Sequence, residues 1–103
     1  MNSIQQQIAD FVEEYAMQTS IQTRVLDLVS EVGEVAKEVL KGSDYGQTTF
    51  QVTSEWSMEL ADALFALVCL ANSTGVDLDD AVQHVLKKYQ QRFDETGEMG
   101  SGQ

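Results

Sequence analysis

Two groups of acidic residues have the spacing of helix faces. One group lies between positions 31 and 38 and the other between positions 55 and 62; the members are Glu31, Glu34 and Glu38, then Glu55, Glu59 and Asp62. Residues three, four or seven positions apart share one side of a helix, with Cβ atoms of neighbours about 5–6 Å apart. If the two helices pack antiparallel, the groups face each other. Such a cluster of carboxylate oxygens suits a hard divalent cation, Mg²⁺ above all.

Asp62 gives the main support for a cation, because the residues around it are apolar. It is the only polar residue in the segment 60–71, and no Lys or Arg lies within one turn of it. An aspartate is almost never fully buried without a partner or a metal. Its nearest acids, Glu55 and Glu59, carry the same charge, and packing like charges together is costly unless a cation neutralises them. The row on residues 31–38, taken alone, is more typical of a solvated helix face.

The whole chain is acidic, and this excludes some partners. Six Lys and Arg residues stand against 17 Asp and Glu residues, which gives a formal net charge of -11 over 103 residues. Phosphate backbones repel such a chain, so we expect no binding to nucleic acid polymers. A phosphorylated small ligand would need a cation to bridge it to the protein. Mg²⁺ is the expected cofactor, with Mn²⁺ as the alternative.

The acidic groups belong to a chain in which four helices are expected and no strand pattern competes. The helices span about residues 3–17, 21–41, 54–73 and 77–93. Apolar residues recur with a period of 3.6 in the first, second and fourth of them, and the chain contains no proline. Ser3 is a candidate N-cap, and Lys41 followed by Gly42 indicates a helix end at which glycine can adopt the left-handed conformation. We therefore expect an all-α, four-helix bundle-type fold.

The third helix is apolar around almost its whole circumference between residues 60 and 71. It needs cover on nearly all sides, which three other helices of so short a chain cannot easily give. The sequence therefore predicts a homodimer or a dimer of dimers. We expect one domain over residues 1–93 and a flexible C-terminal tail over residues 94–103. Residues 42–53 form the longest connection, a length typical of functional or mobile loops.

Two further features concern the compartment. The N-terminal residues lack the basic and apolar regions of a signal peptide. The longest apolar stretch, residues 63–71, has about half the length that a membrane span needs. We expect a cytoplasmic protein without a membrane partner.

Two short motifs connect the acidic groups to a known family. Glu31-Val-Gly-Glu34 and Glu59-Leu-Ala-Asp62 form the pattern ExxE followed by ExxD. With the apolar segment ELADALFALVCLAN and the ending KYQQRF, the chain resembles the MazG-type all-α nucleotide pyrophosphohydrolases over about residues 20–93. The resemblance implies Mg²⁺-dependent hydrolysis of nucleoside triphosphates, often deoxynucleotides, to the monophosphate and pyrophosphate. It also implies dimers or tetramers and a role in house-cleaning of the nucleotide pool.

The resemblance assigns roles to individual residues. The motif acids Glu31, Glu34, Glu59 and Asp62 correspond to metal ligands. The basic residues Lys88 and Arg92 correspond to positions near the phosphates. Many relatives have a further glutamate directly before the first motif acid, where this chain has Ser30. The number of metal ions and the carboxylate that activates water therefore stay open, and the catalytic candidates are Glu31, Glu34 and Glu38.

Several residues allow a second interpretation. Trp56 could stack on a nucleobase, although a tryptophan at this place is more often part of a core. Lys88 and Arg92 could be ordinary surface cations near a helix C-terminus. His84 is expected on the surface, and Cys69 is expected to be a small core residue.

Two other functions also remain open at this stage. One is a dUTPase-like all-α hydrolase of narrow specificity. The short chain argues mildly against it, since dimeric dUTPases tend to be longer. The other is a non-catalytic acidic helical module that binds a basic protein, and Asp62 within its apolar helix argues against that function.

Overall fold

The computed structural model describes residues 3–96 of the chain. These residues contain four α-helices and no strand. The helices are α1 (Ile4–Glu14), α2 (Ile21–Gly42), α3 (Trp56–Ser73) and α4 (Leu78–Thr96). The predicted all-α class and the four helices are thus confirmed.

Side-chain caps explain where the helices begin. The hydroxyl of Ser3 accepts a hydrogen bond from the backbone N–H of Gln6 at 3.2 Å, which confirms the predicted N-cap of α1. The hydroxyl of Ser20 accepts from the N–H of Thr23 at 3.1 Å before α2. Asp77 accepts from the N–H of Asp80 at 3.2 Å at the start of α4. Each cap satisfies a donor that the first turn of a helix leaves unpaired.

The helix ends differ from the predicted bounds by a few residues. α1 stops at Glu14 instead of residue 17, and Ala16 beyond it has a positive φ of 52°. α3 begins two residues later than predicted, at Trp56. α4 continues to Thr96, so residues 94–96 of the predicted tail are helical. The rest of that tail lies outside the described residues.

Gly42 ends α2 for a different reason from the predicted one. It does not adopt a positive φ; the residues that do so after α2 are Asp44, Tyr45 and Gly46. A Cβ atom at position 42 would lie 2.5 Å from both the carbonyl oxygen of Gln51 and the ring of Phe50. The returning loop also donates a hydrogen bond from the N–H of Gln51 to the carbonyl of Gly42, at 2.9 Å. Glycine is needed here because the loop passes so close to the helix.

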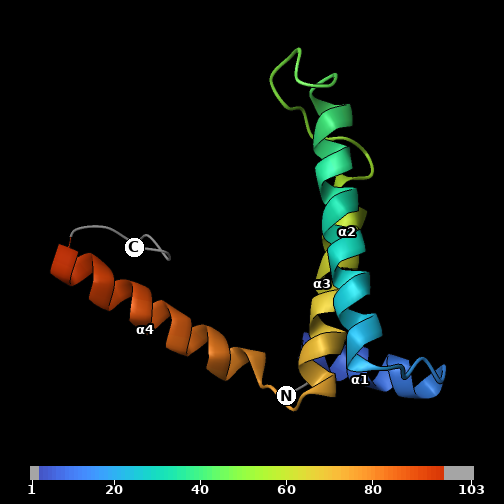
Figure 1. Cartoon of the computed structure of the whole chain (residues 1–103), viewed down its shortest axis with the longest axis vertical. Helices are drawn as coiled ribbons and strands as arrows, with labels where there is room; N and C mark the ends of the chain where they lie inside the picture. The colour runs from blue at the N-terminus through green and yellow to red at the C-terminus, as the bar shows by residue number, and fades with distance from the viewer. Residues whose placement is uncertain (1–2, 97–103) are drawn as a thin grey trace.

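The helices pack around α3 (Figure 1). α2 and α3 run antiparallel side by side and make the most extensive contact in the chain, while α1 packs against α3. Phe11 of α1 and Phe65 of α3 meet edge to face, with ring centroids 6.3 Å apart. Among residues 3–96, the buried apolar residues all belong to α3: Ala66, Val68, Cys69 and Ala71. Cys69 is therefore the core residue that the sequence predicts.

α4 turns away from the other helices and does not close the bundle within one chain (Figure 1). The axes of α3 and α4 are bent by 103° at the connection, which contains Gly75 with a φ of 71°. The Cα radius of gyration is 16.8 Å, against about 13 Å for a compact domain of 100 residues. One chain therefore leaves much apolar side-chain surface open to solvent.

None of the four described helices is by itself long and apolar enough to cross a membrane. α3 and α4 pass that test only when taken together, on length and composition alone, and they are the pair with the sharp bend.

Candidate active site

The four motif acids lie on the two helices that pack most closely. Glu31 and Glu34 belong to the middle of α2, and Glu59 and Asp62 to the first half of α3. Because α2 and α3 run antiparallel (Figure 1), these segments lie beside each other. The contact between α2 and α3, the most extensive one in the described fold, thus brings the ExxE and ExxD motifs together.

The pKa of Glu59 reports the proximity of these carboxylates. Partial burial is the largest cause that raises this pKa above 4.5, and the negative charges of Glu34, Asp62, Glu38 and Glu31 raise it further, in that order. The Coulomb interaction falls with distance, so the two rows of acids share one electrostatic environment. In this site, Glu59 has charged neighbours on both helices.

Asp62 is exposed in the chain, although its apolar surroundings in the sequence suggested burial. The reason is that α4 does not cover this part of α3. The repulsion among the carboxylates, not the burial of Asp62, is therefore what a cation would relieve. Glu55, the remaining acid of the predicted row, is also exposed, and its Oε1 accepts a hydrogen bond from the hydroxyl of Ser54 at 3.1 Å.

The donor atoms fit a hard cation, but they do not form a closed cage. Carboxylate oxygens are the ligands that Mg²⁺ prefers, and Mg²⁺ usually takes one or two of them together with water and phosphate oxygens. Within residues 3–96, no three His, Cys, Asp or Glu side chains converge as a metal site would require. The fit to Mg²⁺ therefore rests on the chemistry of the carboxylate oxygens.

Glu38 has a different position from the other acids of α2. It is only 4% exposed, and its Oε2 accepts a hydrogen bond from the hydroxyl of Thr53 at 2.5 Å. Its Oε1 lies 3.7 Å from the ammonium group of Lys41. Both contacts attach the loop after α2 and the end of α2 to the same side chain. Glu38 thus holds the loop in place beside the other carboxylates.

Of the predicted substrate-binding residues, Trp56 lies on the helix of the ExxD motif, whereas the two basic residues do not lie at the carboxylates of their own chain. Lys88 and Arg92 belong to α4, which leads away from α2 and α3 within the described residues (Figure 1). The ammonium group of the exposed Lys88 lies 5.4 Å from the ring centroid of Tyr89. Trp56 is half-buried at the start of α3 and meets Phe50 of the loop edge to face, with centroids 5.1 Å apart. His84 is exposed, as the sequence predicts.

Residues 19–96 match the family model of the MazG nucleotide pyrophosphohydrolase domain. The chain belongs to this family. An uncharacterised protein of Bacillus subtilis, YpjD, is 35% identical to it over 88 residues, which cover 82% of this chain and 75% of YpjD. The crystal structure of YpjD, described as a candidate pyrophosphatase, has a TM-score of 0.73 at 32% identity and covers 89% of this chain and 94% of YpjD. These likenesses support a nucleotide pyrophosphohydrolase.

Sequence reasoning missed the contacts that brace this MazG domain. Thr53 was assigned only to a loop, yet it binds the buried Glu38. Asn72 exchanges hydrogen bonds with Gln5: its Oδ1 accepts from the Gln5 side chain at 2.9 Å, and its Nδ2 donates to the Gln5 carbonyl at 3.1 Å. Both pairs join residues far apart along the chain, and no local pattern in the sequence marks them.

Proposed function

We propose that this protein is a Mg²⁺-dependent hydrolase that converts nucleoside triphosphates, including deoxynucleotides, to the monophosphate and pyrophosphate. The observation that carries the proposal is the antiparallel packing of α2 and α3, which places the ExxE segment beside the ExxD segment; the negative charges of Glu31, Glu34 and Asp62 accordingly raise the pKa of Glu59. Four carboxylates so arranged repel one another and also repel a triphosphate. The same arrangement becomes favourable when divalent cations stand between the protein and the phosphates.

In this proposal, Glu31, Glu34, Glu59 and Asp62 hold the cation. When bound, Mg²⁺ supplies positive charge at the phosphates and lowers the pKa of water. The oxygen of a water molecule attacks the α-phosphorus, the bond from this phosphorus to the α–β bridging oxygen breaks, and pyrophosphate leaves. We assign the proton of the attacking water to Glu31 or Glu34. Glu38 is less suited to receive it, because its carboxylate already contacts Thr53 and Lys41.

We propose further that the enzyme is a homo-oligomer and that α4 of one copy serves the carboxylates of another. Lys88 and Arg92 would then hold the outer phosphates. Two observations support this arrangement. α4 leads away from α2 and α3 of its own chain. It also exposes an apolar stripe to solvent: Val82, Val85, Leu86 and Phe93.

A second copy would also cover an exposed apolar surface on α3. Leu60, Leu64 and Leu67 lie at helical spacing and are each more than 40% exposed. Burying apolar surface of this kind stabilises association by about 25 cal/mol per Å².

The decisive experiment identifies the products. The purified chain is incubated with each ribo- and deoxyribonucleoside triphosphate, with Mg²⁺, with Mn²⁺ or with EDTA, and the nucleotides and phosphates are separated. We expect the monophosphate and pyrophosphate, only with a divalent cation. In ¹⁸O-labelled water the label should enter the monophosphate. Orthophosphate and a nucleoside diphosphate as first products would contradict the proposal.

The same panel addresses the physiological role. We propose house-cleaning of the nucleotide pool, which predicts turnover of several nucleotides. Hydrolysis of dUTP alone would instead indicate the narrow, dUTPase-like alternative. No turnover with any metal would favour the non-catalytic acidic module.

A further inference from the structure

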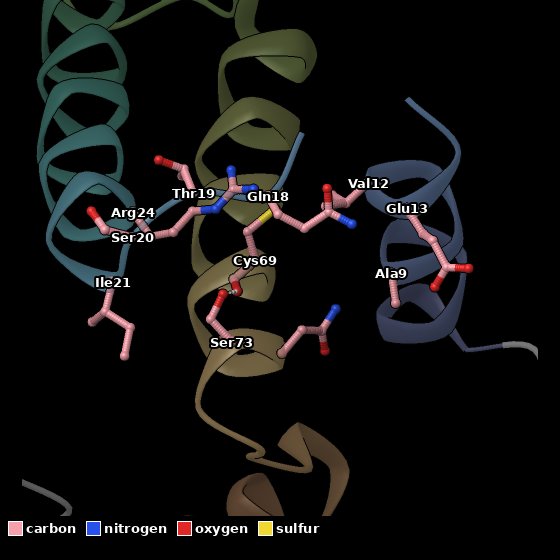
Figure 2. Close-up of a pocket in the computed structure, with 11 residues that line it drawn as sticks. Ala9, Val12, Glu13, Gln18, Thr19, Ser20, Ile21, Arg24, Cys69 and Ser73 are labelled. Carbon is pink, nitrogen blue, oxygen red and sulfur yellow. Dashed lines mark hydrogen bonds between the residues drawn. The ribbon is translucent and has the colours of Figure 1, made fainter. Parts of the chain in front are cut away.

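A cavity of about 510 Å³ lies between α1, the beginning of α2 and the end of α3 (Figure 2). Its lining includes Ala9 and Val12 of α1, Ile21 and Arg24 of α2, and Cys69 of α3. None of the motif acids lines it. Arg24 precedes Glu31 by seven residues, and Cys69 follows Asp62 by seven, so the cavity lies about two helical turns from the carboxylates.

Arg24 is the unusual residue of this cavity. It is only 5% exposed. Its Nη2 donates a hydrogen bond to the backbone carbonyl of Met17 at 2.6 Å, which is a neutral acceptor. Its Nε is buried and has no hydrogen-bond partner within residues 3–96. A buried charge and an unsatisfied buried donor are both costly, and an anionic acceptor that reaches the guanidinium group offsets part of this cost.

Cys69 does not supply that anion. Burial raises the pKa of its thiol, Arg24 lowers this pKa, and Asp27 raises it, with burial the largest effect. The net shift is upward from 9.0, so the thiol stays neutral at neutral pH. The positive charge of Arg24 therefore keeps its capacity to bind an acceptor from the cavity.

We propose that this cavity binds a small organic molecule that carries one carboxylate group, with Arg24 as its anchor. The planar guanidinium group matches a carboxylate in shape and can give it two parallel hydrogen bonds. Ala9, Val12 and Ile21 offer apolar surface for the hydrocarbon part of the ligand. Glu13 also lines the cavity, and its charge opposes a multiply charged anion such as phosphate more strongly than a monocarboxylate. The site does not depend on the proposed hydrolase activity.

The test is a calorimetric titration of the whole chain with benzoate, in EDTA so that no divalent cation can bridge the ligand to the motif acids. Benzamide, which has the same shape without the charge, and inorganic phosphate serve as comparison ligands. We expect benzoate to bind at least tenfold more tightly than either. Arg24→Gln should weaken benzoate binding at least tenfold. Lys37→Gln, which removes the same charge from an exposed position of α2, should leave it unchanged.

A second variant covers the case in which Arg24→Gln does not fold. Ala9→Phe keeps Arg24 and fills part of the cavity, so it should abolish benzoate binding while circular dichroism shows an unchanged helix content. Absence of benzoate binding to the unmodified chain would overturn the proposal, and so would equal losses in Arg24→Gln and Lys37→Gln. The proposal is also overturned if Arg24→Gln dissociates the oligomer while benzoate does not bind, because a second copy then fills the cavity.

Discussion

At Glu59, partial burial and four neighbouring carboxylates favour the protonated form, and this has a consequence for stability. The folded-state pKa is raised above the unfolded value of 4.5. The stability that the proton contributes is therefore fully present below about pH 4.5 and is lost as the pH rises through the folded pKa. We expect Glu59→Gln to raise the melting temperature of the metal-free chain at pH 7, measured by circular dichroism in EDTA.

The control for this prediction is Glu14→Gln, which removes the same charge from an exposed position of α1. It should change the melting temperature much less than Glu59→Gln at pH 7. Below pH 4.5 both variants should melt close to the unmodified chain. If Glu59→Gln destabilises the metal-free chain at pH 7, the repulsion inferred at Glu59 is wrong.

The motif carboxylates also predict how the melting temperature of the chain responds to Mg²⁺. A ligand that binds only the folded state stabilises it by about 2.7 kcal/mol at 100 times its Kd. Mg²⁺ should therefore raise the melting temperature of the unmodified chain. It should have little effect on Asp62→Ala, which should also lose hydrolysis while it keeps its helix content. Equal shifts in the two proteins would argue against Asp62 as a ligand.

A substitution at Gly42 tests whether glycine is needed there because a side chain has no room or because of its backbone conformation. In Gly42→Ala the new methyl group meets the Gln51 carbonyl and the Phe50 ring at 2.5 Å, so we expect a loss of about 1–3 kcal/mol in the free energy of unfolding. Gly33→Ala is the matched control, because nothing lies within 4 Å of the added Cβ atom. It should instead stabilise α2 by about 0.5–1 kcal/mol. Urea unfolding at one protein concentration measures both, and equal losses would contradict this account.

At the scale of the elements, Gln5 of α1 binds the end of α3, the connection after it and the beginning of α4, all about 70 positions later in the chain. Its side chain donates to Asn72 of α3 and to the Val76 carbonyl, each at 2.9 Å, and accepts from the Leu78 N–H of α4 at 2.6 Å. We expect Gln5→Ala to free the first turn of α4, so that the Leu78 amide exchanges its hydrogen at least tenfold faster, as measured by NMR.

Gln6→Ala is the control for this prediction. The side chain of Gln6 contacts Asp10 within α1 at 2.9 Å. Exchange at Leu78 should therefore stay unchanged in this variant. Equal acceleration in both variants would mean that α1 as a whole, and not the Gln5 contacts, holds the beginning of α4.

The elements also show what the sequence could and could not predict. The 3.6-residue period and the caps at Ser3 and Asp77 are local features, so the four helices and most of their starts could be predicted. The direction of α4 could not, since it depends on the turn at Gly75 and on Gln5 far away in the chain. The motif spacing predicted which acids share a helix face. The burial of Arg24 and the contact between Glu38 and Thr53 arise only when the helices pack.

At the scale of the whole molecule, the apolar stripes on α3 and α4 predict self-association. Light scattering at micromolar concentration should give at least about twice the chain mass of 11.4 kDa. Leu86→Asp places a charge within the exposed stripe of α4, where Leu86 is 53% exposed, and should shift the protein towards the monomer. Gln91→Asp adds the same charge on another face of α4 and should not. A mass of about 11 kDa for the unmodified chain would reject the oligomer.

We predict that α4 of one copy completes the carboxylate site of another. Glu59→Gln removes a predicted metal ligand, and the double variant Lys88→Ala/Arg92→Ala removes the predicted phosphate contacts, so each protein alone should be nearly inactive. Mixing and refolding them together forms dimers of both kinds. If Lys88 and Arg92 of one copy serve the carboxylates of the other copy, each mixed dimer contains one intact site. About a quarter of the unmodified activity should then return, as statistical mixing in a symmetric dimer requires.

The opposite arrangement gives a different result in the same experiment. If Lys88 and Arg92 serve the carboxylates of their own chain, every site in the mixed dimer carries one of the defects, and no activity returns. A parallel refolding of each variant alone controls for the procedure. Because α4 diverges from α2 and α3 within one chain, we expect the activity to return.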